Sequence, residues 1–175
     1  MRYTSLAKFM IVAFATLFVA NRASAQTYQL DSNLDPFQEV PPHNTPGFGS
    51  ADFTLDAGAA TLTVNLSTGI YADLLAGAST VRLQDAAVGL NGPTLGLFNL
   101  DTPGNTSGTF SGSVGGLTAG QIADVLAGNT YVNIADSVFT SGEIRGQIFT
   151  VPEPGSLAIL GGVGLLAMRR RRMRA

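Results

Sequence analysis

The chain has 175 residues, of which 45% are hydrophobic, 13% are charged and none is cysteine, and its formal net charge is −2. The lack of cysteine excludes disulfides, thiolate catalysis and thiolate metal ligation. Residues 26–152 hold two of the ten Lys and Arg residues and eleven of the twelve Asp and Glu residues, so this span carries a charge of about −9. Because so few cations cannot neutralise a phosphate backbone, we expect no nucleic-acid partner.

The first 25 residues are typical of a secretory signal peptide. A basic start precedes an apolar run, residues 9–20, which has the length of a signal-peptide core. Ala23 and Ala25 supply the small residues of a cleavage site, and we therefore expect the mature chain to begin at Gln26. An uncleaved amphipathic anchor is disfavoured because the apolar run has no polar face.

The body that follows, residues 26–150, is expected to be one domain of short strands. An entry segment with a proline-rich loop precedes a strict alternation of apolar and polar residues in residues 52–56 and 61–67. A period of two with one polar face predicts antiparallel strands that cover one side of a core. Related patterns predict further strands in residues 79–85, 94–100, 109–114, 131–134 and 142–149.

One segment of the body has the period of a helix instead. Thr118 and Gln121 have the spacing of a capping box, apolar residues follow on one helical face, and Gly128 marks a stop. The combined pattern predicts an all-β fold, an antiparallel Greek-key β-sandwich of about eight short strands with one short helix. Two hydrophobic terminal helices are expected to flank this domain.

The last 25 residues, 151–175, contain three parts in a fixed order. A Pro-Glu-Pro-Gly turn comes first, residues 157–168 form an apolar run, and a basic cluster follows. At about 1.5 Å per residue, the apolar run makes a helix of about 18 Å, well short of a hydrocarbon core of about 30 Å. The residues of the turn motif and of the basic cluster are Pro152, Glu153, Pro154, Arg169, Arg170, Arg171 and Arg172.

This order of motif, short apolar helix and basic cluster resembles the PEP-CTERM sorting tail of bacteria. The resemblance implies that the tail holds an exported precursor at the inner membrane until an exosortase removes it near the Pro-Glu-Pro. Basic flanks stay in the cytoplasm, so the body between the two apolar runs is expected to cross the membrane. We expect transient anchoring at the inner membrane, an exosortase-type processing enzyme, and a final place at the cell surface or in the extracellular matrix, with exopolysaccharide as a candidate partner. The alternative is a short tail anchor that is never cut.

Four pieces of the body resemble the CHRD domain, which was first described in chordin and is widespread in bacterial exported proteins. They are residues 34–42 (LDPFQEVPP), 49–66 (GSADFTLDAGAATLTVNL), 117–134 (LTAGQIADVLAGNTYVNI) and 141–148 (SGEIRGQI). The resemblance covers most of residues 34–149 and implies an exported, usually non-enzymatic β-sandwich.

The chain departs from that family at its histidines. The family usually carries a His-Ile-His-Gly-Pro run in a middle strand and a His after Tyr-Val-Asn-Val. Here the first aligns with residues 81–85 (VRLQD) and the second with Ala135, so all three imidazoles are absent. A metal or pH role of those histidines therefore does not carry over.

Catalytic chemistry finds little support in the residue types present. His43 is the only histidine and lies in the proline-rich loop, where it is expected to be a surface residue, because one imidazole cannot build a zinc or copper site without carboxylates or another chain. No Gly-x-Ser-x-Gly elbow accompanies it, and the absence of Trp disfavours sugar hydrolysis. Glu143 and Arg145 are expected to form a structural ion pair with a neighbouring strand rather than a catalytic pair.

Calcium binding is the main alternative to a purely structural role. Residues 31–35 (DSNLD) begin like an EF-hand loop, but Pro36 and Pro42 occupy the positions that need Gly and a bidentate Glu. Scattered loop aspartates could still meet around Ca²⁺, which accepts flexible all-oxygen shells. These are Asp73, Asp85, Asp101 and Asp136.

Three hypotheses follow from the sequence. The favoured one is a non-catalytic exported protein, sorted by its tail to the cell surface or exopolysaccharide matrix, with a structural or adhesive role. The second is a calcium-dependent ligand-binding module at the cell surface. The third, a degenerate metalloenzyme scaffold, is the least favoured. No catalytic, cofactor or metal residue is assigned.

Overall fold

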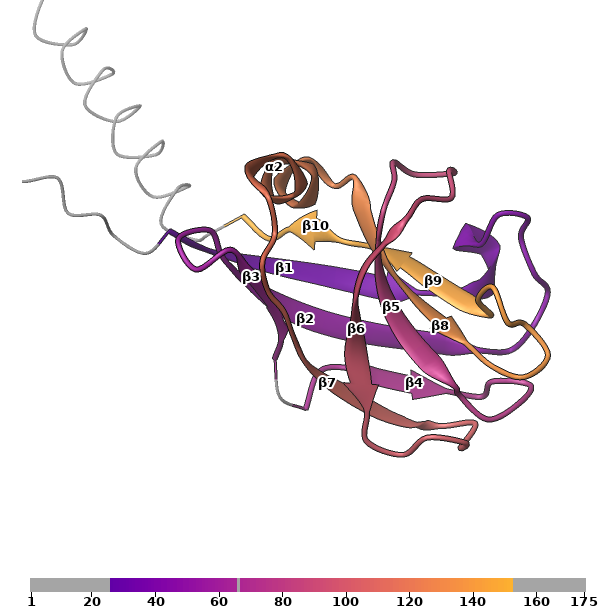
Figure 1. Ribbon diagram of the computed structural model, residues 1–175. Helices are drawn as coiled ribbons and strands as arrows, with labels where there is room; N and C mark the ends of the chain where they lie inside the picture. Colours follow the sequence, from indigo (N-terminus) through magenta and orange to yellow (C-terminus); the bar gives the residue numbers. More distant parts are fainter. Residues whose placement is uncertain (1–25, 66, 153–175) are drawn as a thin grey trace, which may run out of the picture.

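The computed structural model describes residues 26–65 and 67–152, which form a β domain with one α-helix (Figure 1). Of the residues assigned to the cleavage and sorting signals, only Gln26 and Pro152 fall within these spans, and both are exposed. The two predicted terminal helices lie outside the described residues. Within the described part of the chain, no helix is long and apolar enough to cross a membrane.

Ten strands, one 3-10 helix and one α-helix make up the domain. The strands are β1 (Thr27–Leu34), β2 (Phe48–Asp56), β3 (Thr61–Val64), β4 (Ile70–Ala72), β5 (Thr80–Asp85), β6 (Thr94–Leu100), β7 (Gly108–Val114), β8 (Thr130–Ala135), β9 (Ile144–Gln147) and β10 (Phe149–Thr150). The 3-10 helix is η1 (Pro36–Gln38), and the α-helix is α2 (Ala119–Ala127).

The strands form one continuous antiparallel sheet whose two ends come together. The strand order is β10-β1-β2-β3-β7-β6-β5-β8-β9, and β4 pairs with both β2 and β7. Beyond β9, the backbones of Asp35 and Arg145 exchange hydrogen bonds of 3.0 and 3.1 Å, which joins the end of β1 to the last strand of the order. The sheet therefore curves around its core, with α2 lying near β10 at one end of the domain (Figure 1).

The alternating positions of the sequence fill this core as the period of two predicts. Phe53 and Leu55 of β2 are fully buried, while Thr54 between them is only partly covered. The rings of Phe53 and Phe110 lie on either side of Phe98, with centroids 5.9 and 6.3 Å from its own. Burying such side chains stabilises the fold by about 1.5–3 kcal/mol each.

The predicted helix is confirmed together with its boundaries. Thr118 and Gln121 form the capping box, in which the Thr118 hydroxyl accepts from the Gln121 N–H and the Gln121 side chain accepts from the Thr118 N–H. Gly128 ends the helix in the left-handed conformation, with φ 76°. Val125 is its fully buried residue, which fixes the helix against the sheet.

The all-β, antiparallel class with one α-helix is confirmed, but the strand count differs from the expected eight. The entry segment is a full strand, since β1 pairs with β2 along its whole length, and β4 and β10 are too short to show a periodicity. Strand β2 also starts earlier than predicted, at Phe48. Gly49 interrupts the alternation of apolar and polar residues there. A Cβ at this position would lie 2.7 Å from the Ile70 carbonyl oxygen, so the close pairing of β2 with β4 requires glycine.

Candidate functional site

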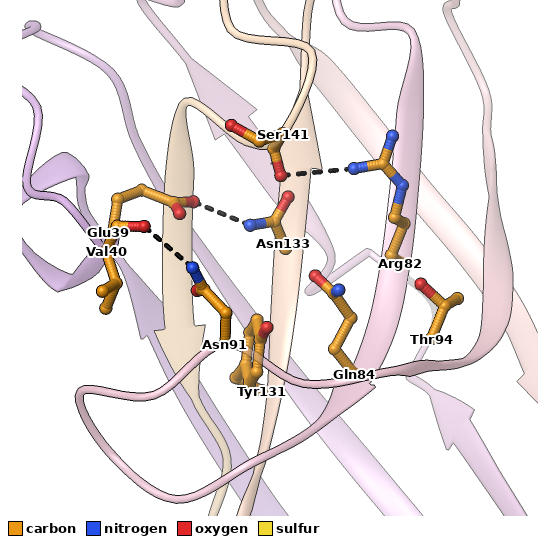
Figure 2. A pocket seen from close by; sticks show the side chains of 9 residues that line it. All are labelled: Glu39, Val40, Arg82, Gln84, Asn91, Thr94, Tyr131, Asn133 and Ser141. Carbon is orange, nitrogen blue, oxygen red and sulfur yellow. Dashed lines mark hydrogen bonds between the residues drawn. The ribbon is translucent and has the colours of Figure 1, made fainter.

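A polar pocket of about 290 Å³ lies on the outer side of β5 and β8 (Figure 2). Residues of the loops that follow η1 and β5 contribute to its walls, so the pocket is partly enclosed. Its walls carry one carboxyl, one guanidinium and several amide and hydroxyl groups. The lining residues are Glu39, Val40, Arg82, Gln84, Asn91, Thr94, Tyr131, Asn133 and Ser141.

The register of β5 and β8 sets four of these side chains on one face. Arg82 pairs with Asn133, and Gln84 pairs with Tyr131. Because side chains alternate along a strand, the intervening residues point into the core instead. Those residues, Val81, Leu83, Val132 and Ile134, are all fully buried.

Two loops, the start of β6 and the turn before β9 supply the remaining walls. Asp35 caps η1 by accepting hydrogen bonds from the Phe37 and Gln38 N–H groups at 2.8 and 3.0 Å, which positions Glu39 directly after the helix. Asn91, in the loop between β5 and β6, donates through Nδ2 to the Val40 carbonyl at 2.9 Å. This bond ties the two loops together across the mouth of the pocket.

Glu39 is the carboxyl group of the pocket, and it is only 5% exposed. Its Oε1 accepts a hydrogen bond of 2.8 Å from Asn133 Nδ2 (Figure 2). Burial raises the pKa of Glu39 to about 7, although the positive charges of Arg145 and Arg82 oppose the rise. The side chain is therefore partly protonated near neutral pH, so it can both donate and accept.

The two arginines of the body meet at this site. Arg82 donates to the carbonyl oxygens of Ser141 and Thr140 at 3.3 and 3.2 Å, which fixes its guanidinium at the edge of the pocket (Figure 2). Arg145 is 1% exposed, and its guanidinium carbon lies 3.4 Å from the centre of the Tyr131 ring, a cation–π contact. Tyr131 thus links a buried cation to the pocket wall.

The predicted ion pair of Glu143 and Arg145 with a neighbouring strand is wrong. The Arg145 guanidinium donates to neutral oxygens, of which the nearest is the Leu90 carbonyl at 2.8 Å, followed by the Gln147 side-chain amide at 3.2 Å. Glu143 instead accepts from the Leu75 N–H through both carboxylate oxygens, at 3.1 and 3.0 Å. Backbone groups of loops distant in the chain form hydrogen bonds with both side chains. Within the described residues, neither side chain therefore pairs with a charged residue of a neighbouring strand.

Glu143 forms a second cluster with Asp136, away from the pocket. Burial and the hydrogen bond with Asp136 raise the pKa of Glu143 to about 7. Burial also acts to raise the pKa of Asp136, but the hydrogen bond with Glu143 and three backbone N–H groups outweigh it and hold that pKa below its ordinary value. Asp136 and Glu143 share a hydrogen bond, and they accept further hydrogen bonds from the Ala76 and Leu75 N–H groups. These bonds hold the loop before β5 against the turn after β8.

The four candidate calcium aspartates do not meet. Asp136 is occupied by Glu143 and backbone N–H groups, and Asp101 accepts from the Thr109 and Ser111 hydroxyls at 2.8 and 3.0 Å. Across residues 26–65 and 67–152, no group of three or more His, Asp or Glu side chains could hold a metal ion. His43 packs against Phe139, with ring centroids 4.3 Å apart.

The sequence alone did not assign this pocket, although it held one signal. Residues 81–85, the segment compared above with the family's histidine run, contribute Arg82 and Gln84 to the pocket lining, whereas Ala135 is buried. In the structure, β8 is buried on both faces and yet carries Asn133, which places a polar side chain on its covered outer face. The contributions of Glu39, Asn91 and Ser141 could not be inferred from the sequence, because loops far apart in the chain bring them together.

Comparison with known protein families agrees with both resemblances. Residues 30–148 match the model of the CHRD domain, and residues 150–172 match that of the PEP-CTERM protein-sorting motif. The chain belongs to the CHRD-domain family. Its PEP-CTERM motif marks an exported protein whose precursor is anchored at the membrane through its C-terminus and processed by an exosortase. No curated protein and no solved structure gives a match.

Proposed function

We propose that the processed protein resides at the cell surface or in the exopolysaccharide matrix and has a structural or adhesive role there, without catalysis. The observation that carries this proposal is the PEP-CTERM motif directly behind the CHRD domain, at residues 150–172. The acidic body is compatible with an extracellular place, since a net charge far from zero keeps proteins soluble.

The pocket supports a binding role better than a catalytic one. A glycoside hydrolase of the usual kind needs two carboxyl groups on opposite sides of the scissile bond, whereas Glu39 is the one carboxyl among the pocket's lining residues. A serine nucleophile needs an imidazole or similar base, and His43 packs on Phe139 outside the lining. What the pocket offers is a fixed set of hydrogen-bond donors and acceptors.

The experiment that tests the proposal is the intact mass of the protein recovered from the cell surface. We expect a chain that begins at Gln26 and ends close to residues 152–154, without the basic cluster at residues 169–172. A matched control replaces Pro152 and Pro154 by Ala, which removes the motif but leaves the apolar run and the arginines. That variant should stay with the inner membrane at full C-terminal length. Recovery of surface protein that still carries the four arginines would contradict the proposal.

A further inference from the structure

We propose that the pocket on β5 and β8 binds one uronic acid residue, a carboxylated sugar ring, of an acidic polysaccharide. The inference rests on the proposed function, because it names the matrix chemistry that would retain the protein outside the cell. Three features of the pocket lead to this ligand: where the positive charge of the domain lies, which hydrogen-bonding groups are free, and how much space there is.

Positive charge is concentrated at this one place. Residues 26–152 contain eleven acidic side chains and two arginines, and both arginines belong to the pocket region. Arg82 lines the cavity, and Arg145 stacks on Tyr131 in its wall. Acidic groups more than about 8 Å away are largely screened at physiological ionic strength, whereas Arg82 would contact a bound anion directly. Arg82 is therefore the lining group that attracts an anionic ligand to the pocket.

The Arg82 guanidinium is prepared for a carboxylate. It has five N–H donors, and the Thr140 and Ser141 carbonyls engage one terminal nitrogen each, which fixes the plane of the fork. These two carbonyls leave the other N–H donors of the guanidinium to a ligand. A planar carboxylate matches such a fork in a bidentate way, and this is a geometry that an ammonium group cannot offer.

An unsatisfied acceptor in the pocket lining favours a ligand that also carries hydroxyl groups. Asn133 is 2% exposed, its Nδ2 donates to Glu39, and its Oδ1 has no hydrogen-bond partner. Figure 2 shows this oxygen on the side of the amide that faces Arg82 and Ser141. A carboxylate has only acceptors at neutral pH, so it satisfies Arg82 but not Asn133. A ligand that satisfies both carries an anionic group and an O–H donor on one small frame.

The size of the pocket limits that frame to one ring. Its volume of about 290 Å³ equals that of roughly ten water molecules at about 30 Å³ each. This is room for one sugar ring of about a dozen non-hydrogen atoms, with Thr94 and Gln84 as further polar neighbours. A neighbouring sugar of the same chain would lie outside the pocket, which fits recognition of one residue of a polysaccharide.

The test is a calorimetric titration of the full chain, purified in mild detergent, with D-glucuronate, D-glucose and acetate at pH 6. Glucuronate supplies both features, glucose lacks the anion, and acetate lacks the hydroxyls. We expect glucuronate to bind at least tenfold more tightly than either of the other two. Equal affinity for glucuronate and glucose would overturn the inference, and so would equal affinity for glucuronate and acetate.

Two variants and a control locate the binding. Arg82→Gln should lower the affinity for glucuronate at least tenfold, to the level of glucose. Arg82→Lys keeps the charge without the planar fork and should give an intermediate affinity. Asn105→Asp makes the same charge change on an exposed loop outside the pocket lining and should alter the affinity less than twofold. Unchanged glucuronate binding by Arg82→Gln would overturn the inference.

This titration separates the inference from the proposed function. Binding by purified protein does not depend on where the cell sends the chain. A correctly sorted chain that fails to bind glucuronate therefore overturns the ligand alone, and a chain that binds it but keeps its tail arginines at the surface overturns the sorting alone.

Discussion

Replacing Glu39 by glutamine should make the domain more stable at alkaline pH and reduce the dependence of its stability on pH. Burial raises the pKa of Glu39 from an ordinary value of 4.5 to about 7 in the folded state. Below pH 4.5 the carboxyl is protonated in both the folded and the unfolded chain, so it does not alter the free energy of unfolding. As the pH rises from 4.5 to 7, the unfolded chain loses the proton first, and the folded state is destabilised.

The size of this effect follows from the two pKa values. At about 1.36 kcal/mol for each pH unit between them, the ionisation of Glu39 costs about 3 kcal/mol of stability at pH 8. The amide that Glu39→Gln introduces cannot ionise, but its oxygen can still accept the hydrogen bond from Asn133. The variant should therefore match the wild type at pH 4.5 and exceed it by about 3 kcal/mol at pH 8, which is roughly 10 °C in melting temperature for a domain of this size.

The measurement is urea unfolding of both proteins at several pH values between 4.5 and 8.5. Asp52→Asn serves as the control, since Asp52 is exposed and its loss changes the net charge by the same amount. We expect the control to follow the wild-type pH profile, because it removes only general charge repulsion. If Glu39→Gln and wild type lose stability in parallel over this range, burial does not penalise the Glu39 carboxylate, and the reasoning is refuted.

Three further predictions concern the second carboxyl cluster, the backbone and metal binding. Glu143→Gln should also raise stability at pH 8, since burial and the hydrogen bond with Asp136 raise the pKa of Glu143 to about 7; an unfolding series showing no gain would contradict this. Gly142→Ala should lower the free energy of unfolding by about 1–3 kcal/mol. The reason is that Gly142 has φ 146° and an added Cβ would collide with the side-chain amide of Asn133. Ser141→Ala, which needs no new space, is the control. Adding millimolar Ca²⁺ should leave the melting temperature unchanged. A ligand at 100 times its dissociation constant would add about 2.7 kcal/mol to the free energy of unfolding, so a clear rise in melting temperature would restore the calcium hypothesis.

The sequence predicts those parts of the fold that depend on local periodicity. Residues 52–56 and 61–67 alternate because one face of β2 and β3 is buried, and the capping box at Thr118 is complete within four residues. The Greek-key arrangement, the domain boundaries and the two terminal helices stay predictions. Strand β4 escaped prediction because three residues between β2 and β7 give no period, and its pairing depends on contacts distant in the chain.

The pocket could not be predicted for the same physical reason. Arg82 and Asn133 are far apart in the chain, and the register of β5 and β8 brings them opposite each other. Glu39 reaches Asn133 across 94 positions of sequence. Residue types also misled at Glu143 and Arg145, whose charges suggested an ion pair with a neighbouring strand, while carbonyl oxygens of the loop after β5 occupy the Arg145 guanidinium.

The pairing of β10 with β1 determines how the domain is presented during export. The Val151 N–H donates to the Gln29 carbonyl at 2.9 Å, so the first and last strands leave the domain side by side. Gln26 and Pro152 therefore lie at the same end of the domain, so the segments that precede and follow the described residues join it there. The loops that follow β4 and β6 lie at the opposite end of the domain (Figure 1).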